Sequence, residues 1–201
     1  MVDPSGLYEG SLPWMIATCS DALSAAGIIH GFGGALALAY ATNEPRGTID
    51  IDINIVADAA HPKGALRALP SAIRHTDADV AAIRRDGQVR LYWPREGRVA
   101  VPIDLFFPQH AFHAVVAGRI RRVEFATTTI PVISPTDIVI FKVLFNRTKD
   151  WADIEAVIAA RSANFTEVAR WLAQLLGPES RQLRRLLTLL KSAGVVINTE
   201  G

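Results

Sequence analysis

A segment in which apolar and polar side chains alternate without a break is the feature that most restricts how this chain can fold. In Thr48–Val56 an isoleucine occupies every second position, and Asp50, Asp52 and Asn54 stand between the isoleucines. Successive side chains of a β-strand point to opposite faces of the sheet. The alternation therefore predicts a half-buried strand with four isoleucines on one face and carboxylates on the other.

The segments around this strand predict an α/β (α+β) fold in which a mixed first part is followed by helices. The turn dipeptides Asp86-Gly87 and Glu96-Gly97 divide residues 77–107 into strands, and the last of these carries Asp104 on the face opposite to its apolar residues. We expect a catalytic core over residues 1–133 and a helical region over 134–201. Helices are expected at 11–26, 35–42, 63–74, 109–118, 135–146, 150–161, 166–176 and 179–192, and extended segments at 27–30, 48–56, 77–107 and 119–133.

Composition places the chain among globular proteins and excludes several classes of site. Half of the 201 residues are hydrophobic and the formal net charge is +1, so neither disorder nor wholesale electrostatic binding of nucleic acid is expected. The single cysteine, Cys19, excludes an intrachain disulfide and a multi-cysteine zinc site. The first residues do not resemble a signal peptide, and glycines interrupt the uncharged segment 22–43, so we expect a cytoplasmic protein with no membrane span.

Asp50 and Asp52 are the strongest candidates for a metal site. They lie on one face of the strand about 6.6 Å apart by strand rise. At an effective dielectric constant of about 20 their charges repel by about 2 to 3 kcal/mol, which favours a neighbouring cation. Asp104 can bring a third carboxylate to the same side, and three carboxylates suit Mg²⁺ or Mn²⁺ better than zinc. A solvated strand face is the alternative interpretation of the Asp-x-Asp pattern.

Gly33 and Gly34 precede a short helix and come before the aspartate strand. Glycines in such a turn leave backbone N–H groups free to approach a phosphate, and Mg²⁺ in proteins is often bound by carboxylates together with substrate phosphates. The combination points to phosphoryl or nucleotidyl transfer. The two glycines could instead serve only to pack a strand closely against a helix.

The segment from Gly33-Gly34-Ala35-Leu36 through Tyr40 to Arg46-Gly47-Thr48-Ile49-Asp50-Ile51-Asp52 resembles the Gly-Gly and Arg-x-Thr-x-Asp-x-Asp signature of polymerase-β-type nucleotidyltransferases. It is most similar to a bacterial group that includes abortive-infection toxin-like nucleotidyltransferases and small-molecule or tRNA-modifying relatives. The resemblance covers about residues 27–161. Polymerase-like members often have Gly-Ser where this chain has Gly33-Gly34, so the serine hydroxyl is missing here.

The resemblance implies a nucleotidyltransferase-type mixed sheet flanked by helices, and a role for each matching residue. Asp50 and Asp52 would hold metal ions, Asp104 would help to activate the acceptor hydroxyl, and Gly33 and Gly34 would cradle the triphosphate. The substrate would be a nucleoside triphosphate, with Mg²⁺ or Mn²⁺ as cofactor. A cognate antitoxin is a further partner that the resemblance suggests.

A second match is Ser134-Pro135-Thr136-Asp137, Lys142 and Arg147-Thr148-Lys149-Asp150-Trp151-Ala152-Asp153, which is similar to the Lys and Arg-x-Lys-Asp-x-x-Asp segment of that group. Lys142 interrupts an apolar run, and a buried unpaired ammonium is costly, so it should reach an anion such as a nucleotide phosphate or Asp104. Its stem could also cover apolar surface with the ammonium in water. Asp150 and Asp153 suit the start of a helix. Arg46 and Thr48 could orient phosphates or serve only the strand start.

We therefore expect a Mg²⁺-dependent nucleotidyltransferase that moves an NMP from an NTP to a hydroxyl acceptor and releases pyrophosphate. The acceptor stays open between RNA, protein and small molecules. Arginines between Arg84 and Arg122 could hold RNA if they cluster with Tyr92 and Trp93, or could be a solvated sheet edge. A catalytically inactive nucleotide- or partner-binding member of the fold, and an antitoxin-like interaction module, are the alternatives.

Overall fold

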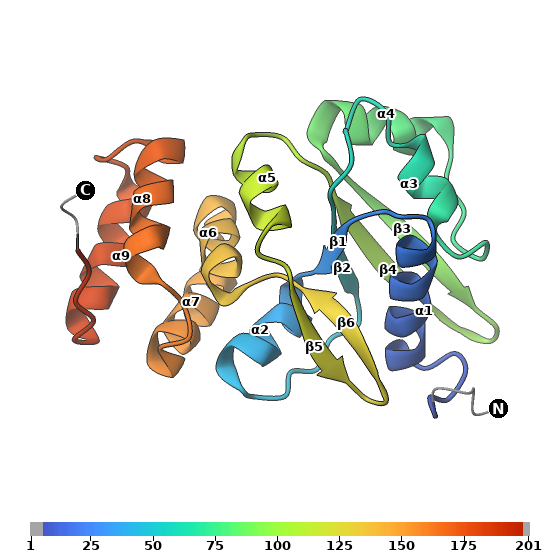
Figure 1. Cartoon of the computed structure of the whole chain (residues 1–201), viewed down its shortest axis with the longest axis horizontal. Helices are drawn as coiled ribbons and strands as arrows, with labels where there is room; N and C mark the ends of the chain where they lie inside the picture. The colour runs from blue at the N-terminus through green and yellow to red at the C-terminus, as the bar shows by residue number, and fades with distance from the viewer. Residues whose placement is uncertain (1–5, 199–201) are drawn as a thin grey trace. The chain divides into compact units, whose positions relative to one another are not determined.

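The computed structural model describes residues 6–198, whose strands form one mixed sheet (Figure 1). Its strands are β1 (His30–Phe32), β2 (Ile51–Ile55), β3 (Gln88–Arg95), β4 (Arg98–Phe106), β5 (Arg121–Phe125) and β6 (Thr128–Val132). They are ordered β3-β4-β2-β1-β6-β5. The pairs β2–β4 and β1–β6 are parallel and the other neighbours are antiparallel. The predicted α/β class and mixed sheet are confirmed.

The helices of the described residues include the helical C-terminal third that the sequence predicted. They are α1 (Leu12–Ala25), α2 (Gly34–Thr42), α3 (Lys63–Ala68), α4 (Asp77–Asp86), α5 (Phe112–Ala117), α6 (Pro135–Phe145), α7 (Thr148–Ala160), α8 (Phe165–Leu176) and α9 (Arg181–Ser192). Two boundaries differ clearly from prediction: α3 ends at Ala68 instead of continuing to Arg74, and β1 spans His30–Phe32, whereas the extended segment was expected at 27–30. Within residues 6–198, each helix is too short or too polar to traverse a lipid bilayer.

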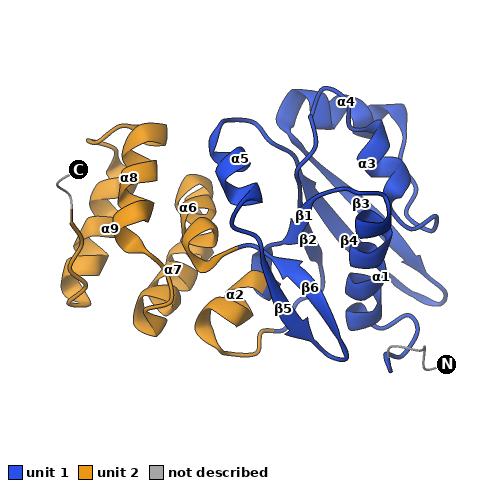
Figure 2. Cartoon of the chain, viewed as in Figure 1, with its two compact units in different colours: residues 1–36, 47–133 blue, residues 37–46, 134–201 orange. Residues whose placement is uncertain are grey.

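The chain divides into two compact units (Figure 2). Unit 1 comprises residues 1–36 and 47–133 and contains every strand of the sheet. Unit 2 comprises residues 37–46 and 134–201, and its described part is helical. The second unit thus takes its main segment from Ser134 onward, where the sequence places the helical region, and adds residues 37–46, which the sequence assigns to the catalytic core.

The apolar side chains of β2, β3 and β4 share one face of the sheet. The register places Ile51 beside Ile103, and Ile103 opposite Leu91, and all three are buried. Helix α1 covers this face, because Trp14 meets Trp93 edge to face with ring centroids 5.6 Å apart. Since side chains alternate along each strand, the polar residues of the same strands face the opposite side.

The alternating apolar pattern extends beyond the ordered sheet at two places. Ile49 was expected to join the buried isoleucines, but its side chain lies before β2 and the residue is 82% exposed. Val99 was likewise expected on the buried face of β4, and it is exposed near the β3–β4 turn. Alternation predicts the direction of side chains along a strand but not where a partner element stops covering them.

Helix α4 occupies residues that the sequence analysis predicted to be a strand, and that prediction is wrong. Thr76 caps its N-terminus and forms a capping box with Asp79, whose carboxylate accepts from the Thr76 backbone N–H at 2.7 Å. Gly87 ends the helix in the left-handed conformation, with φ 65°. Val80 and Ile83 are buried at helical spacing. Capping at both ends stabilises a helix whose apolar pattern is too short to identify it.

The capping box gives a test of this correction. We expect Thr76→Ala to lower the free energy of unfolding by about 1 kcal/mol, because it removes the side-chain acceptor for the Asp79 N–H, whereas Thr76→Ser should retain most of the stability. Urea denaturation followed by circular dichroism measures both. Equal stability of the alanine and wild-type proteins would show that the cap does not hold α4.

Candidate active site

The glycine turn lies directly against the aspartate strand. The Gly33 N–H donates to the Asp52 carbonyl at 2.9 Å, and Gly34, the first residue of α2, has φ +52°. A Cβ atom on Gly34 would overlap the Asp52 carboxylate, and one on Gly33 would lie 2.9 Å from the side-chain nitrogen of Asn54. Both glycines therefore permit an approach that no larger residue allows. Close packing of the turn against β2 therefore explains why both residues are glycines. The same packing places the backbone of the turn next to Asp52, a predicted metal ligand.

Asp52 and Asp104 lie side by side on parallel strands. They are Cα partners in the β2–β4 register, and both side chains point to the face opposite the buried isoleucines. Neighbouring strands are about 4.8 Å apart, so two carboxylates share a small volume. Asp50 immediately precedes β2, in line with its alternating pattern. Unit 1 thus brings the three predicted carboxylates to one side of its sheet.

Thr48 forms hydrogen bonds with Asp50. Its hydroxyl donates to the Asp50 carboxylate at 2.6 Å, and the hydroxyl oxygen accepts from the Asp50 backbone N–H at 3.3 Å. A cavity of about 10 Å³ adjoins this arrangement, and Gly33, Thr48, Asp50 and Asp52 are among its lining residues. That volume is close to the space one water molecule needs. Four of the predicted site residues of unit 1 therefore meet at one point.

Arg90, which the sequence placed only among the arginines of a possible RNA-binding strip, is the partner of Asp104. Its Nε and Nη2 donate to the two carboxylate oxygens of Asp104 at 2.7 and 2.6 Å, across the β3–β4 pair in which the two residues are opposite. The hydrogen bonds and charge of Asp104, together with the nearby Tyr92 and Asp50, raise the pKa of the Arg90 guanidinium above its usual range. A bidentate arginine therefore neutralises the third carboxylate.

Within residues 6–198, no three His, Cys, Asp or Glu side chains are arranged as a group that could hold a metal ion. Two of the three predicted carboxylates already accept hydrogen bonds from other side chains: Asp50 from Thr48, and Asp104 from Arg90. Magnesium is commonly held by one or two carboxylates plus substrate phosphates. The oxygen donors of Asp50 and Asp52 suit such a shared site.

Arg46 and Lys142, the predicted phosphate-binding cations, lie in unit 2 and are paired there. Lys142 Nζ is 2.6 Å from an Asp153 oxygen and 3.5 Å from an Asp150 oxygen, and the residue is only 7% exposed. Arg46 Nη1 lies 2.6 Å from the other Asp153 oxygen. The lysine thus has an anionic partner, as its burial requires, and that partner is an aspartate of the following helix.

Asp150 combines a helix-start role with a buried charge. Its carboxylate accepts from the Arg147 backbone N–H at 3.1 Å in a capping box of α7, as a helix-start aspartate should, and also from the Arg147 guanidinium at 2.7 Å. Burial opposes its ionisation, but the hydrogen bonds from Arg147 and the charges of Lys142 and Arg147 outweigh burial and lower the pKa of Asp150. It is therefore a structural carboxylate of unit 2.

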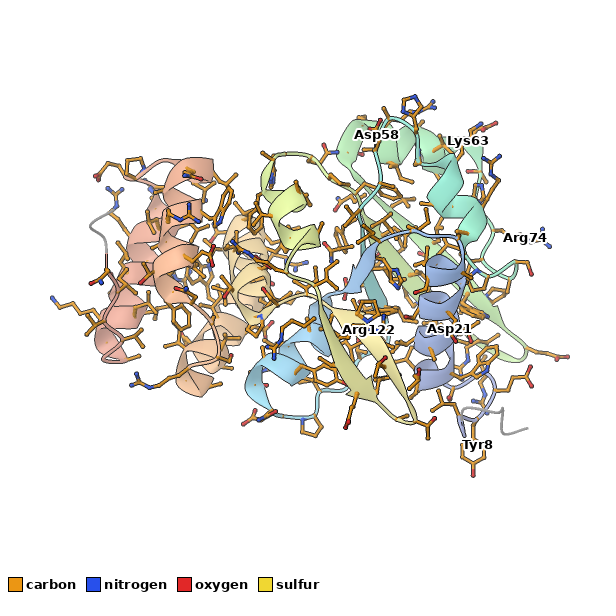
Figure 3. The ribbon with its side chains drawn as sticks, viewed as in Figure 1. Tyr8, Asp21, Asp58, Lys63, Arg74 and Arg122 are labelled. Carbon is orange, nitrogen blue, oxygen red and sulfur yellow. The ribbon has the colours of Figure 1, made fainter. Side chains whose placement is uncertain are left out.

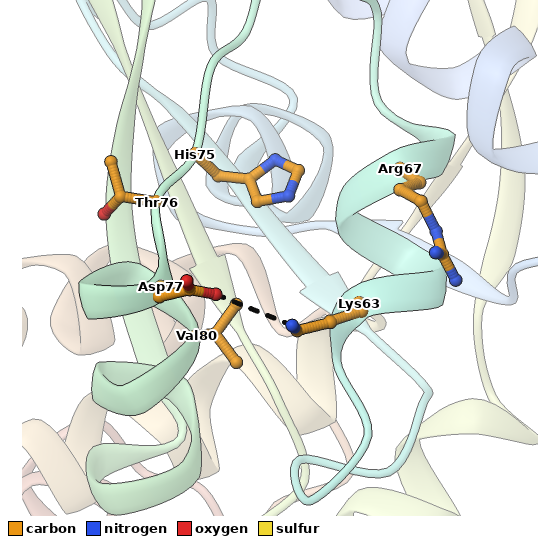
Figure 4. Close-up of a pocket in the computed structure, with 6 residues that line it drawn as sticks. All are labelled: Lys63, Arg67, His75, Thr76, Asp77 and Val80. Carbon is orange, nitrogen blue, oxygen red and sulfur yellow. Dashed lines mark ion pairs between the residues drawn. The ribbon is translucent and has the colours of Figure 1, made fainter.

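A second cavity of unit 1, larger than the one beside Asp52, is lined by none of the predicted site residues. It measures about 350 Å³ and lies between α3 and the start of α4 (Figure 4). Lys63 and Asp77 form an ion pair of 3.5 Å across it. Its lining residues are Lys63, Arg67, His75, Thr76, Asp77 and Val80.

The arginines that could have formed one strip are divided between the two edges of the sheet. Arg90 lies on β3 and Arg122 on β5, the first and last strands in the spatial order. Trp93 points into the apolar core and is 6% exposed, whereas Tyr92 on the other face is 55% exposed. The tyrosine, without the tryptophan, therefore shares a surface with Arg90.

Comparison with known proteins identifies the fold. No protein-family model and no curated protein sequence matches this chain. The structure is similar to that of an antigenic nucleotidyltransferase-like protein from Paracoccidioides brasiliensis, with a TM-score of 0.54, 17% identity and 96% of each chain covered. The chain therefore has a nucleotidyltransferase-like fold, as its sequence resemblance implies.

Two further structures align with lower scores. JHP933 from Helicobacter pylori gives a TM-score of 0.45 at 14% identity, with 94% of this chain and 92% of that chain covered. The antibiotic-resistance factor ANT(2'')-Ia gives 0.42 at 14% identity, with 90% and 91% covered.

The contact between the glycine turn and Asp52 can be separated from backbone strain. Gly34→Ala places a Cβ in a left-handed residue and against the Asp52 carboxylate, whereas Gly27→Ala has a similar φ of +68° with no atom near the new Cβ. Strain alone costs about 1 to 2 kcal/mol. We expect Gly34→Ala to lose more stability than Gly27→Ala in urea denaturation. Equal losses would mean that Gly34 is required only for its backbone conformation.

The lowered pKa of Asp150 predicts that the protein loses stability in acid. Because its folded-state pKa is lowered, its contribution is complete above the unfolded-state pKa of about 4 and is lost as pH falls through the folded-state value. Asp150→Asn should destabilise the protein by about 3 kcal/mol at pH 7, and the deficit relative to wild type should shrink below about pH 4. Asp86→Asn, which breaks the exposed Arg85 pair, should cost under about 1 kcal/mol. A deficit that does not change with pH would contradict the assignment.

Proposed function

We propose that this chain, which has a nucleotidyltransferase-like fold, transfers a nucleoside monophosphate from an NTP to a hydroxyl acceptor with Mg²⁺ or Mn²⁺ as cofactor. The observation that carries the proposal is the close approach of Gly34 to Asp52, with Asp104 beside Asp52 in the strand register. A turn without Cβ atoms next to paired carboxylates supplies backbone donors for phosphates and oxygen ligands for a divalent cation.

The donor set is suited to magnesium. Asp50 and Asp52 would supply carboxylate oxygens, and the triphosphate would complete the coordination. A divalent cation bound there would neutralise the charge that develops on the reacting phosphate. Thr48 fixes the Asp50 carboxylate through its hydroxyl, so that side chain is oriented before a ligand arrives.

In the proposed reaction an acceptor hydroxyl oxygen forms a bond to the α-phosphorus of the NTP. The bond from that phosphorus to the bridging oxygen breaks, and pyrophosphate leaves with the electron pair. The hydroxyl proton passes to the Asp104 carboxylate and then to water. The Gly33 N–H is bonded to the Asp52 carbonyl, so the backbone N–H groups at the start of α2, from Gly34 onward, would lie near the phosphates. Positioning and charge neutralisation supply the catalysis.

One observation favours a second candidate, a nucleotide-binding protein without transferase activity. Both carboxylate oxygens of Asp104 already accept hydrogen bonds from Arg90. A site whose charges are satisfied internally has less need of metal and phosphate. Isothermal titration calorimetry showing Mg²⁺-dependent NTP binding, with no pyrophosphate released for any acceptor, would support this candidate over transfer.

The transferase proposal is tested by label transfer. Purified protein is incubated with each α-labelled NTP, Mg²⁺ and a cell extract, and products are separated into RNA, protein and small-molecule fractions. We expect Asp50→Asn and Asp52→Asn to lower transfer at least a hundredfold with little change in melting temperature, because neutralising either carboxylate also removes repulsion in the folded state.

Asp21→Asn is the matched control, since Asp21 is an exposed carboxylate on α1 (Figure 3) and should leave transfer unchanged. Full activity of the Asp52→Asn protein would refute the assignment of the site. Loss of activity in the Asp21→Asn protein would mean that the assay reports a general effect of charge or folding.

A further inference from the structure

Arg90 and Tyr92 form an exposed pair at the edge of the sheet beside Asp104. They are two residues apart on β3, so their side chains share the face that carries the carboxylates. Tyr92 is 55% exposed, and the Arg90 side chain is half exposed even though it is bonded to Asp104. An exposed aromatic ring and a guanidinium therefore lie next to the carboxylate that faces the acceptor in the proposed reaction.

The Arg90–Asp104 pair leaves the arginine able to bind a second anion. A guanidinium carries five N–H hydrogens, and the bonds to Asp104 come from Nε and Nη2. Arginine recognises phosphate through the same forked arrangement of donors. A phosphate on the exposed side of Arg90 can therefore be bound while the guanidinium still holds Asp104.

Tyr92 adds a surface for a planar ring. It lies opposite Pro102 in the β3–β4 register, so the ring has an apolar neighbour on the same face and its remaining surface is open to solvent. Stacking of a base on an aromatic side chain contributes about 1 to 3 kcal/mol in single-stranded nucleic acid complexes. A phosphate contact next to a stacking ring is the chemistry that binds one unit of a single-stranded RNA.

We propose that Arg90 and Tyr92 are the acceptor subsite for the 3′ end of a single-stranded RNA, an inference that rests on the proposed transferase function. Arg90 binds a backbone phosphate, Tyr92 stacks on a base, and the terminal hydroxyl faces Asp104. The new bond joins the RNA 3′ oxygen to the α-phosphorus, and pyrophosphate is released as in the proposed reaction. Arg90 thus has a second role as a positioning residue, because it orients the Asp104 carboxylate.

Binding is measured by fluorescence anisotropy of a 5′-labelled single-stranded RNA hexamer with the full chain in Mg²⁺. We expect Arg90→Gln and Tyr92→Ala each to weaken binding at least fivefold, and Tyr92→Phe to bind within about twofold of wild type, because phenylalanine keeps the stacking surface. Arg121→Gln, on the edge strand β5, and Tyr8→Ala are matched controls and should also bind within about twofold. Wild-type protein that does not bind the hexamer, or Arg90→Gln protein that binds like the controls, would overturn the inference.

A kinetic split separates an acceptor contact from a purely structural role. With RNA as acceptor, Tyr92→Ala should raise the KM for RNA at least fivefold and leave the KM for NTP unchanged, with wild-type melting temperature. An equal rise of both KM values would contradict an acceptor subsite.

The two proposals fail in different ways. Label transfer by wild-type protein to a small molecule or to protein, with none to RNA, would overturn the RNA subsite and leave the transferase function standing. Hexamer binding that depends on Arg90 and Tyr92, without transfer of any NMP, would show that the pair binds RNA but would contradict the transferase function and, with it, the acceptor role of the pair.

Discussion

The repulsion between carboxylates on one face of the sheet is the constraint on which the proposed site depends. Asp52 and Asp104 are partners on adjacent parallel strands, and Asp50 precedes the same strand as Asp52. Like charges at such spacing disfavour joint ionisation unless a cation or hydrogen-bond donors compensate them. The chain supplies part of that compensation itself, with the guanidinium of Arg90 on Asp104 and the hydroxyl of Thr48 on Asp50. In our account a divalent cation and its nucleotide supply the rest.

The remainder of unit 1 holds these residues in place. Burial of Ile51 and Ile53 fixes the register of β2, because a slip by one residue would turn both isoleucines to the polar face. Gly34 allows the helix start to contact Asp52. Unit 2 also contains a charge that needs a partner of opposite sign. Its buried Lys142 ammonium is neutralised by Asp153. Asp104 in unit 1, and Lys142 and Arg46 in unit 2, are each paired with another side chain of the same unit.

Periodicity and turn signals predicted the fold class and the positions of most elements, because those depend on neighbouring residues. Alternation identified β2, and the Ser134-Pro135 pair identified the start of α6, where the Ser134 hydroxyl accepts from the Asp137 backbone N–H. The prediction was wrong at α4. This helix is short and mostly polar, and the signals that identify it are its capping residues Thr76, Asp79 and Gly87. The sequence could not supply Arg90 as the partner of Asp104, because cross-strand pairing depends on the register of β3 and β4. For Lys142 the sequence predicted an anionic partner but named a nucleotide phosphate or Asp104, whereas in the folded chain the ammonium lies 2.6 Å from an Asp153 oxygen.

The central claim is that Asp50 and Asp52 bind a divalent cation together with a nucleoside triphosphate. The most direct measurement is an anomalous difference map from crystals grown with Mn²⁺ and a non-hydrolysable NTP analogue. We expect an anomalous peak in contact with oxygens of both aspartates and of the triphosphate, with the phosphates next to Gly33 and Gly34. A nucleotide bound elsewhere, or no manganese peak between the two carboxylates, would contradict the account.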